Sequence, residues 1–179
     1  MSGTAHEKAI SVIRFGTNED ANLLATLGSQ TFHDTFADQN KPEDMAVYLS
    51  EAFSPSKQAA ELDKPNVIFL IAESAEVVQG YAKLQSGSSP ACIKSERSIE
   101  IARIYVVNDW IGKGIGANLM RRCLDEAKER GFVTIWLGVW ERNERAQRFY
   151  RDWGFKVVGE QSFQLGSDLQ NDYVMERSL

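Results

Sequence analysis

The chain has 179 residues, of which 43% are hydrophobic and 25% charged, with a net charge of −5 and a pI near 5.1. This length predicts a single domain spanning residues 1–179, because a chain of this size buries enough surface to stabilise one core. The acidic balance excludes nucleic acid and an anionic membrane surface as the main partner.

The first third of the chain predicts one strand followed by three helices. Alternation over residues 9–15 is typical of a strand. Apolar residues then recur at helical spacing up to Phe36, with Thr17 as the expected N-cap. Pro42 and Pro55 mark the starts of two further helices, since proline is well tolerated at the first helical position.

The hydrophobic period changes after residue 65. Strands are predicted at residues 66–73, 76–87, 98–107 and 133–140, and two more strands are predicted to close the sheet after residue 154. Helices are predicted from 115 to 130, ended by Gly131, and from 142 to 154. This order of strands and helices predicts a mixed α/β domain.

The chain carries no signal that would take it out of the cytoplasm. Its first ten residues lack both a basic patch and an apolar stretch, and the longest apolar run, residues 67–72, is too short to span a bilayer. Cys92 and Cys123 stand apart, without CxxC spacing. We therefore expect a cytoplasmic protein with no membrane partner, no disulfide framework and no metal.

Acidic residues are concentrated in the first half of the chain. Residues 1–89 have a net charge of −6, whereas residues 90–179 have a net charge of +1. The asymmetry is typical of a solvated surface. It is also compatible with an acidic lobe that attracts a cationic substrate, beside a lobe that tolerates an anionic cofactor.

Residues 110–117 read WIGKGIGA and precede the helix predicted at residue 115. The first amides of a helix have no intrahelical partner and lie at the positive end of its dipole, so they bind phosphate well. Gly112, Gly114 and Gly116 would let phosphate oxygens reach these amides, and Lys113 adds a positive charge. A tight turn without a ligand is the alternative interpretation.

Two phosphate-binding motifs can be compared with this segment. A P-loop requires Ser or Thr after the lysine, but Gly114 follows Lys113, so ATP hydrolysis is disfavoured. The dinucleotide fingerprint fits better, because Gly112, Gly114 and Ala117 match it and Glu141 stands where a ribose-binding acid belongs. A nucleotide-dependent oxidoreductase of Rossmann type is therefore an alternative hypothesis.

A second pattern lies downstream, where Asn143 opens the motif NxxAxxFYxxxGF. This motif, the glycine segment and the strand IEIARIYV (99–106) together resemble the GCN5-related N-acetyltransferase (GNAT) superfamily, over nearly the whole chain. The phrases TFHDTFADQN (31–40) and AVYLSEAF (46–53) are similar to the PaiA-type polyamine N-acetyltransferases.

The resemblance implies a GNAT fold: one mixed, mostly antiparallel sheet flanked by helices, with strands four and five splayed to admit acetyl-CoA. It implies acetyl-CoA as co-substrate and no metal. Where GNAT proteins generally have Gln or Arg, this chain has Ile111, so backbone amides or Lys113 would have to compensate. The implied cofactor-binding residues are Ile104, Tyr105, Val106, Ile111, Gly112, Lys113, Gly114, Ile115, Gly116, Asn143, Ala146, Phe149 and Tyr150.

Two catalytic residues are predicted. Tyr150 resembles the residue that protonates the coenzyme A sulfur, although an aromatic residue at this spacing can equally be a packing residue. An alkyl amine has a pKa of about 10.4, so the acceptor arrives protonated and needs a base. Glu100 is the expected base, since a carboxylate in a central strand is costly unless paired or functional. An ion pair with Arg103 or Lys83 is the alternative.

The predicted activity is transfer of the acetyl group of acetyl-CoA to a primary amine of a small cationic substrate. The acidic first half and the PaiA resemblance favour a polyamine such as spermidine or spermine. A non-catalytic acyl-CoA-binding regulator is a third hypothesis. The sequence does not determine the oligomeric state, and a homodimer is compatible with it.

Overall fold

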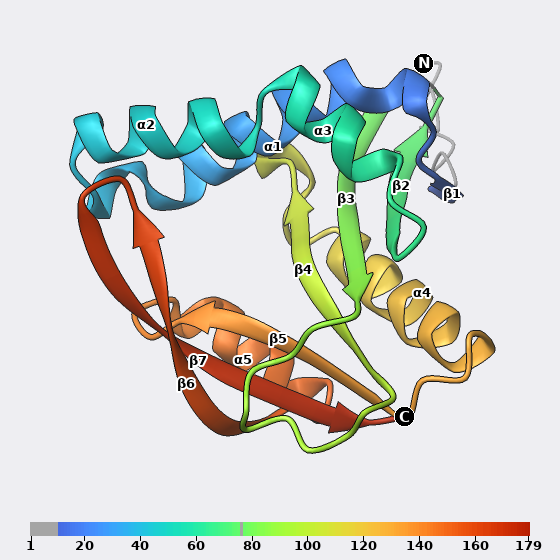
Figure 1. Cartoon of the computed structure of the whole chain (residues 1–179). Coiled ribbons are helices and arrows are strands. Elements are labelled where there is room, and N and C mark those ends of the chain that lie inside the picture. The colour runs from blue at the N-terminus through green and yellow to red at the C-terminus, as the bar shows by residue number, and fades with distance from the viewer. Residues whose placement is uncertain (1–10, 76) are drawn as a thin grey trace, which may run out of the picture.

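Seven strands form one sheet in the order β1-β2-β3-β4-β5-β7-β6. The computed structural model describes residues 11–75 and 77–179 (Figure 1). The strands are β1 Val12–Phe15, β2 Val67–Ser74, β3 Val77–Ser86, β4 Ser98–Val106, β5 Thr134–Trp140, β6 Lys156–Leu165 and β7 Asp168–Ser178. The helices are α1 Ala21–Phe36, α2 Pro42–Ala52, α3 Pro55–Leu62, α4 Ile115–Glu129 and α5 Glu144–Asp152, with single 3-10 turns at Asn18–Asp20, Ala37–Gln39 and Asn108–Trp110.

The predicted strands and helices are confirmed in type and order. Their ends differ from the predicted ones by a few residues, and the first strand starts at Val12, with residues 9 and 10 outside the described range. Two helix ends illustrate why the predicted boundary residues end or begin a helix. Ser54 Oγ accepts a hydrogen bond from Lys57 N (3.3 Å) at the start of α3, and Gly131 follows α4 with φ +79°.

The strands pair antiparallel throughout, except for β4 and β5. These two are parallel but pair only from Ser98↔Thr134 to Glu100↔Trp136, and Figure 1 shows them diverging beyond that point. The expected mixed, mostly antiparallel sheet with splayed strands four and five is confirmed. The Rossmann hypothesis is wrong, because that fold needs a mostly parallel sheet.

Helices cover both faces of the sheet. On one face, Leu24 and Leu27 of α1 pack against Phe69, Ile71 and Tyr81 of β2 and β3. On the opposite face, α4 and α5 bury their apolar residues against the inner strands, as in the cluster that contains Leu119, Met120, Cys123, Tyr150, Leu70, Ile101 and Leu137. The gap between β4 and β5 therefore lies between two helical layers.

The β6–β7 hairpin closes one side of this gap. Figure 1 shows its tip beside α2, where Leu165 packs with Phe32, Met45 and Phe53. Asp44 of α2 accepts a hydrogen bond from Ser167 N (2.6 Å), which attaches the hairpin turn to the helix. Among the described residues, no helix is long and apolar enough to cross a membrane.

Candidate active site

A cleft of about 570 Å³ opens where β4 and β5 separate. Its lining comes from both sides of the sheet: from α1 and α2 on one side, and from α5 and the segment before α4 on the other. The inner strands and the β6–β7 hairpin complete the walls. The cleft thus passes through the sheet.

The glycine segment forms one end of the cleft. Gly112 and Gly114 have φ angles of +79° and +87°, and no atom lies within 4 Å of the place where a Cβ would stand at either residue. In the described part of the chain the amides of residues 115–117 donate to no acceptor, whereas Lys113 N donates to Trp110 O (3.3 Å) and Asn118 N donates to Gly114 O (3.0 Å). An open cradle of free amides fits a diphosphate.

The side chains of this segment differ in position. Ile111 lines the cleft, whereas the Ile115 side chain is buried in the core, so only its amide is available. Lys113 is not among the lining residues, and its Nζ lies over the Trp110 ring, 4.9 Å from the centroid. In this segment, therefore, only the backbone amides are left to make the anion contact that the sequence predicts.

The open edge of β4 forms the middle of the cleft. Ile104, Tyr105 and Val106 line it. Because β4 and β5 stop pairing at Glu100 and Trp136, backbone groups on the facing edges have no strand partner beyond these residues. Such an edge can pair with an extended amide-containing chain.

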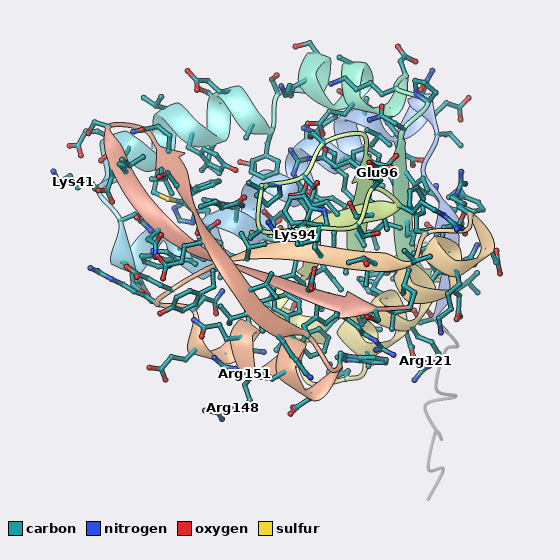
Figure 2. The ribbon with its side chains drawn as sticks, turned by 60° about the horizontal axis from the view of Figure 1, so that its bottom comes forward. Lys41, Lys94, Glu96, Arg121, Arg148 and Arg151 are labelled. Carbon is teal, nitrogen blue, oxygen red and sulfur yellow. The ribbon has the colours of Figure 1, made fainter. Side chains whose placement is uncertain are left out.

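Helix α5 contributes the predicted Asn143, Ala146 and Phe149 to the lining. Asn143 Oδ1 accepts a hydrogen bond from Ala146 N (3.1 Å), so Asn143 caps α5 and also lies in the cleft. Figure 2 shows Arg148 and Arg151 extending outwards from α5, away from the sheet.

Tyr150 also faces the cleft, with 9% of its surface exposed. Its ring packs edge-on between Phe149 and Phe155, at centroid distances of 5.6 and 6.0 Å. Burial raises the pKa of Tyr150 above the usual value of 10.0, which keeps the side chain a neutral phenol at physiological pH. A buried phenol with its proton retained can act as an acid towards a leaving thiolate.

Glu100 is not brought into the cleft. It lies on the part of β4 that still pairs with β5, and its Oε2 accepts a hydrogen bond from Gln85 Nε2 (2.5 Å). Burial raises its pKa, against the opposing effect of that hydrogen bond.

Lys83 and Arg103, the possible ion-pair partners of Glu100, bind a different acid. Glu61 of α3 binds both Lys83 Nζ (3.0 Å) and Arg103 Nη1 (2.8 Å). Burial alone would raise the pKa of Glu61, but the two cations outweigh it and hold the pKa below its usual value.

Asp172 is a cleft residue that the sequence analysis missed. It lies on β7 opposite Trp140, is 9% exposed, and is the only acid among the described residues that line the cleft. Burial, with a smaller contribution from Glu141, raises the pKa of Asp172 to about 6. The sequence did hold one signal: Asp172 stands two positions before the core residue Val174, so strand alternation puts both side chains on the same face. Only the β5–β7 pairing shows that this face meets the opening.

The fold and the through-sheet cleft define the class of acyltransferases that take their acyl group from coenzyme A. The acetyltransferase (GNAT) family matches residues 30–155, which is more than half of the chain. The chain therefore belongs to this family, and it is an acetyl-CoA-dependent N-acetyltransferase. Within the described range, no group of three or more His, Cys, Asp or Glu residues is placed to hold a metal ion.

Relatives and solved structures agree with this assignment. An uncharacterized N-acetyltransferase of Mycobacterium tuberculosis is 35% identical over 160 residues, which cover 89% of this chain and 98% of the relative. The PaiA N-acetyltransferase of Thermoplasma acidophilum, solved with coenzyme A, superposes with a TM-score of 0.78 at 22% identity, covering 95% and 99% of the two chains. The putative acetyltransferase yncA of Salmonella typhimurium, solved with acetyl-CoA, gives 0.66 at 23% identity, covering 96% and 95%. At these identities the two structures show a shared fold.

Proposed function

We propose that the protein acetylates a primary amine of a small cationic acceptor, with the glycine segment and Tyr150 as the donor side of the site. One observation carries this proposal. The free amides at the start of α4 and the Tyr150 phenol open onto the same cleft, which continues through the sheet to the opposite face. A donor bound from one side can therefore meet an acceptor that enters from the other.

The donor would be held mainly by backbone groups. The amides of residues 115–117, with the space above Gly112 and Gly114, suit the diphosphate of acetyl-CoA. The unpaired edge of β4 at Ile104–Val106 suits the amide-containing pantetheine arm. Acetyl-CoA supplies the activated acyl group, and the protein orients it.

Tyr150 then acts where the thioester breaks. As the amine nitrogen bonds to the carbonyl carbon, the carbon–sulfur bond breaks and the departing sulfur takes the Tyr150 proton. A main-chain N–H on the open β4 edge can stabilise the negative charge that develops on the carbonyl oxygen. Most of the rate enhancement should come from holding the two reactants together.

A polyamine is the acceptor that the sequence predicts, and it belongs to this proposal as a candidate. Its support is the acidic first half of the chain and the similarity to PaiA-type proteins. The described buried acids of that half, however, already have partners: Asp20 pairs with Arg14 (2.8 Å), Asp44 accepts a hydrogen bond from Ser167 N (2.6 Å), and Glu61 pairs with Lys83 and Arg103. Their charge does not line the cleft.

The proposal is tested by titration calorimetry followed by a thiol-release assay. Acetyl-CoA should bind, NAD should not, and acetyl-CoA should release free thiol when an amine is added. The amines should include alkyl and arylalkyl monoamines, spermidine and amino acids. Failure of acetyl-CoA to bind at millimolar concentration would refute the donor site. Binding without thiol release for any amine would refute the proposed acceptor class.

A further inference from the structure

The end of the cleft opposite the glycine segment is walled by aromatic rings. Phe32 lies 4.6 Å from Tyr48, Tyr48 lies 5.3 Å from Phe163, and Phe36 lies 6.0 Å from Trp140, measured between ring centroids. All of these residues line the cleft. They come from α1, α2, β5 and β6, so the fold gathers them from distant parts of the sequence.

The polar groups of this end are mostly engaged within the protein. Thr31 Oγ1 donates to Leu27 O (2.7 Å), Thr35 Oγ1 donates to Thr31 O (2.8 Å), and Gln170 Nε2 donates to Asn40 Oδ1 (2.6 Å). The Arg103 guanidinium is held by Glu61 (2.8 Å).

Asp172 is the acidic group at this end, and it is not engaged in this way. Nine-tenths of its surface is buried, yet no side-chain hydrogen bond or ion pair engages its carboxylate within the described ranges. An ionised carboxylate in such surroundings is costly unless a partner arrives.

Asp172 is placed at the opening itself. A Cβ on Gly138 would stand 2.6 Å from Gln161 Nε2 of β6 and 3.3 Å from Asp172 Oδ2, and Gly138 lies two residues past Trp136, where the β4–β5 pairing ends. Asp172 shares its face with Val174, which packs on Trp136, whereas Met175 faces the core under α4. The carboxylate therefore lies on the face opposite the donor helices, beside the gap.

Resting on the proposed function, we infer that Asp172 binds the ammonium group of the acceptor and takes its proton, and that the acceptor is a monoamine with an apolar alkyl or aryl body. One carboxylate matches one ammonium, and aromatic walls match an apolar body and stabilise a cation at their faces. A polyamine would bring further positive charges, and the described cleft lining holds no second acid: Glu141, the acid beside Asp172, is exposed outside that lining and accepts a hydrogen bond from Asn171. An amino acid would bring a carboxylate, while Arg103 is already occupied by Glu61 and the other cation of the described lining, Arg145, lies on α5 at the donor side.

Acetyl transfer at this site forms one carbon–nitrogen bond, breaks one carbon–sulfur bond and moves the protons between Asp172, Tyr150 and the reactants. The ammonium gives one proton to Asp172, and the freed nitrogen lone pair bonds to the thioester carbon. The carbon–sulfur bond breaks, and its electron pair leaves with sulfur, which takes the Tyr150 proton. The new amide nitrogen releases its surplus proton to the Tyr150 phenolate, and Asp172 returns its proton to solvent. Acetylated amine, free thiol and one released proton result.

This assignment has a pH signature. The groups that face Asp172 are Glu141 at the end of β5, Tyr48 on α2 and, further along the cleft, Arg103 on β4. Tyr48 has its pKa raised by burial and stays neutral, and Arg103 stays charged, so neither titrates near neutral pH. Burial raises the pKa of Asp172 to about 6, so kcat/KM should rise with pH through about 6 as the carboxylate ionises.

The experiment compares amines and two variants. Wild-type protein is assayed for thiol release with 2-phenylethylamine, n-hexylamine, spermidine and L-phenylalanine, and both monoamines should exceed spermidine and L-phenylalanine in kcat/KM by about 10-fold or more. Asp172→Asn should lower kcat/KM for the monoamines by about 100-fold or more. It should also abolish the acid limb of the pH profile, which is the rise of kcat/KM with pH through about 6. Glu160→Gln, which removes an exposed carboxylate on neighbouring β6, should leave kcat/KM and its acid limb unchanged.

Acetyl-CoA binding separates this inference from the proposed function. Asp172→Asn should bind acetyl-CoA as tightly as the wild type in calorimetry, because the carboxylate lies on the acceptor face. If acetyl-CoA binds and spermidine is the better substrate, the acceptor class is overturned while the proposed activity stands. If Asp172→Asn retains the acid limb and the wild-type rate, the role of Asp172 is overturned. If acetyl-CoA fails to bind the wild type, both proposals fall.

Discussion

Asp172→Asn should make the protein more stable while it removes activity. In the unfolded chain this carboxyl group ionises near its usual pKa of 3.8, whereas burial raises the pKa to about 6 in the folded protein. At about 1.4 kcal/mol for each pH unit, the difference corresponds to about 3 kcal/mol. Because part of the carboxylate meets water in the cleft, screening should reduce the cost to about 2 kcal/mol.

The sign of this effect depends on pH. The folded protein holds the Asp172 proton more tightly, so its stability falls as pH rises from 3.8 to 6, and the full cost is present above pH 6. The neutral amide of Asp172→Asn avoids that cost. Thermal unfolding followed by circular dichroism should therefore show a Tm higher by about 4–8 °C at pH 7.5.

The gain in Tm should shrink as the pH falls through 6 and disappear below about pH 3, where the wild-type carboxyl group is protonated in both states. Glu160→Gln is the control for general charge effects, since its carboxylate is exposed, and it should show no gain at either pH. An equal or lower Tm for Asp172→Asn at pH 7.5 would mean that the carboxylate is paired or well solvated. Asp172 would then lack the unpaired burial on which its role as an acceptor-binding group depends.

Four further substitutions test other parts of the site. Tyr150→Phe should lower kcat by about 100-fold or more with little change in KM for acetyl-CoA, in steady-state thiol release, because the proton is needed only as the sulfur departs; an unchanged kcat would make Tyr150 a packing residue. Gly114→Ala should weaken acetyl-CoA binding in calorimetry, since φ +87° costs a non-glycine residue about 1–2 kcal/mol and the turn would shift its amides; unchanged affinity would argue against the amide cradle. Glu141→Gln should move the acid limb of kcat/KM to lower pH, because the loss of a neighbouring negative charge lowers the pKa of Asp172; an unmoved limb would contradict that coupling. Glu100→Gln should leave kcat/KM within a few-fold, because Gln85 and not the cleft engages this carboxylate; loss of activity confined to low pH would restore Glu100 as the base.

The donor side of the site could be predicted from sequence because it is local. Backbone amides at a helix start need only a short segment, and glycines with positive φ leave a direct trace in the letters WIGKGIGA. The Asn143 cap and the aromatic face of α5 are equally local, since helical spacing fixes which side chains share a face.

The acceptor side could not be predicted in the same way. Asp172 reaches the gap only because β7 pairs with β5 across the sheet, and Phe32 meets Tyr48 only because α1 packs beside α2. The choice of Glu100 as base shows the limit of a local rule. The rule that a buried carboxylate is costly pointed to Glu100. However, Glu100 still pairs with Trp136 in the parallel β4–β5 ladder, so it lies before the point where the two strands separate.

Two buried carboxylates of this protein show why the unpaired one is the functional candidate. Glu61 is buried with two cations, which hold its pKa below the usual value, so its charge contributes to the packing of α3 on the sheet. Asp172 is buried with no cation and beside another acid, Glu141, and its pKa is raised. The chain can satisfy a buried acid, as Glu61 shows, and leaves Asp172 unsatisfied beside the gap between β4 and β5. An arriving ammonium would remove that cost, so the energy spent on keeping Asp172 unpaired becomes binding energy for a cationic acceptor.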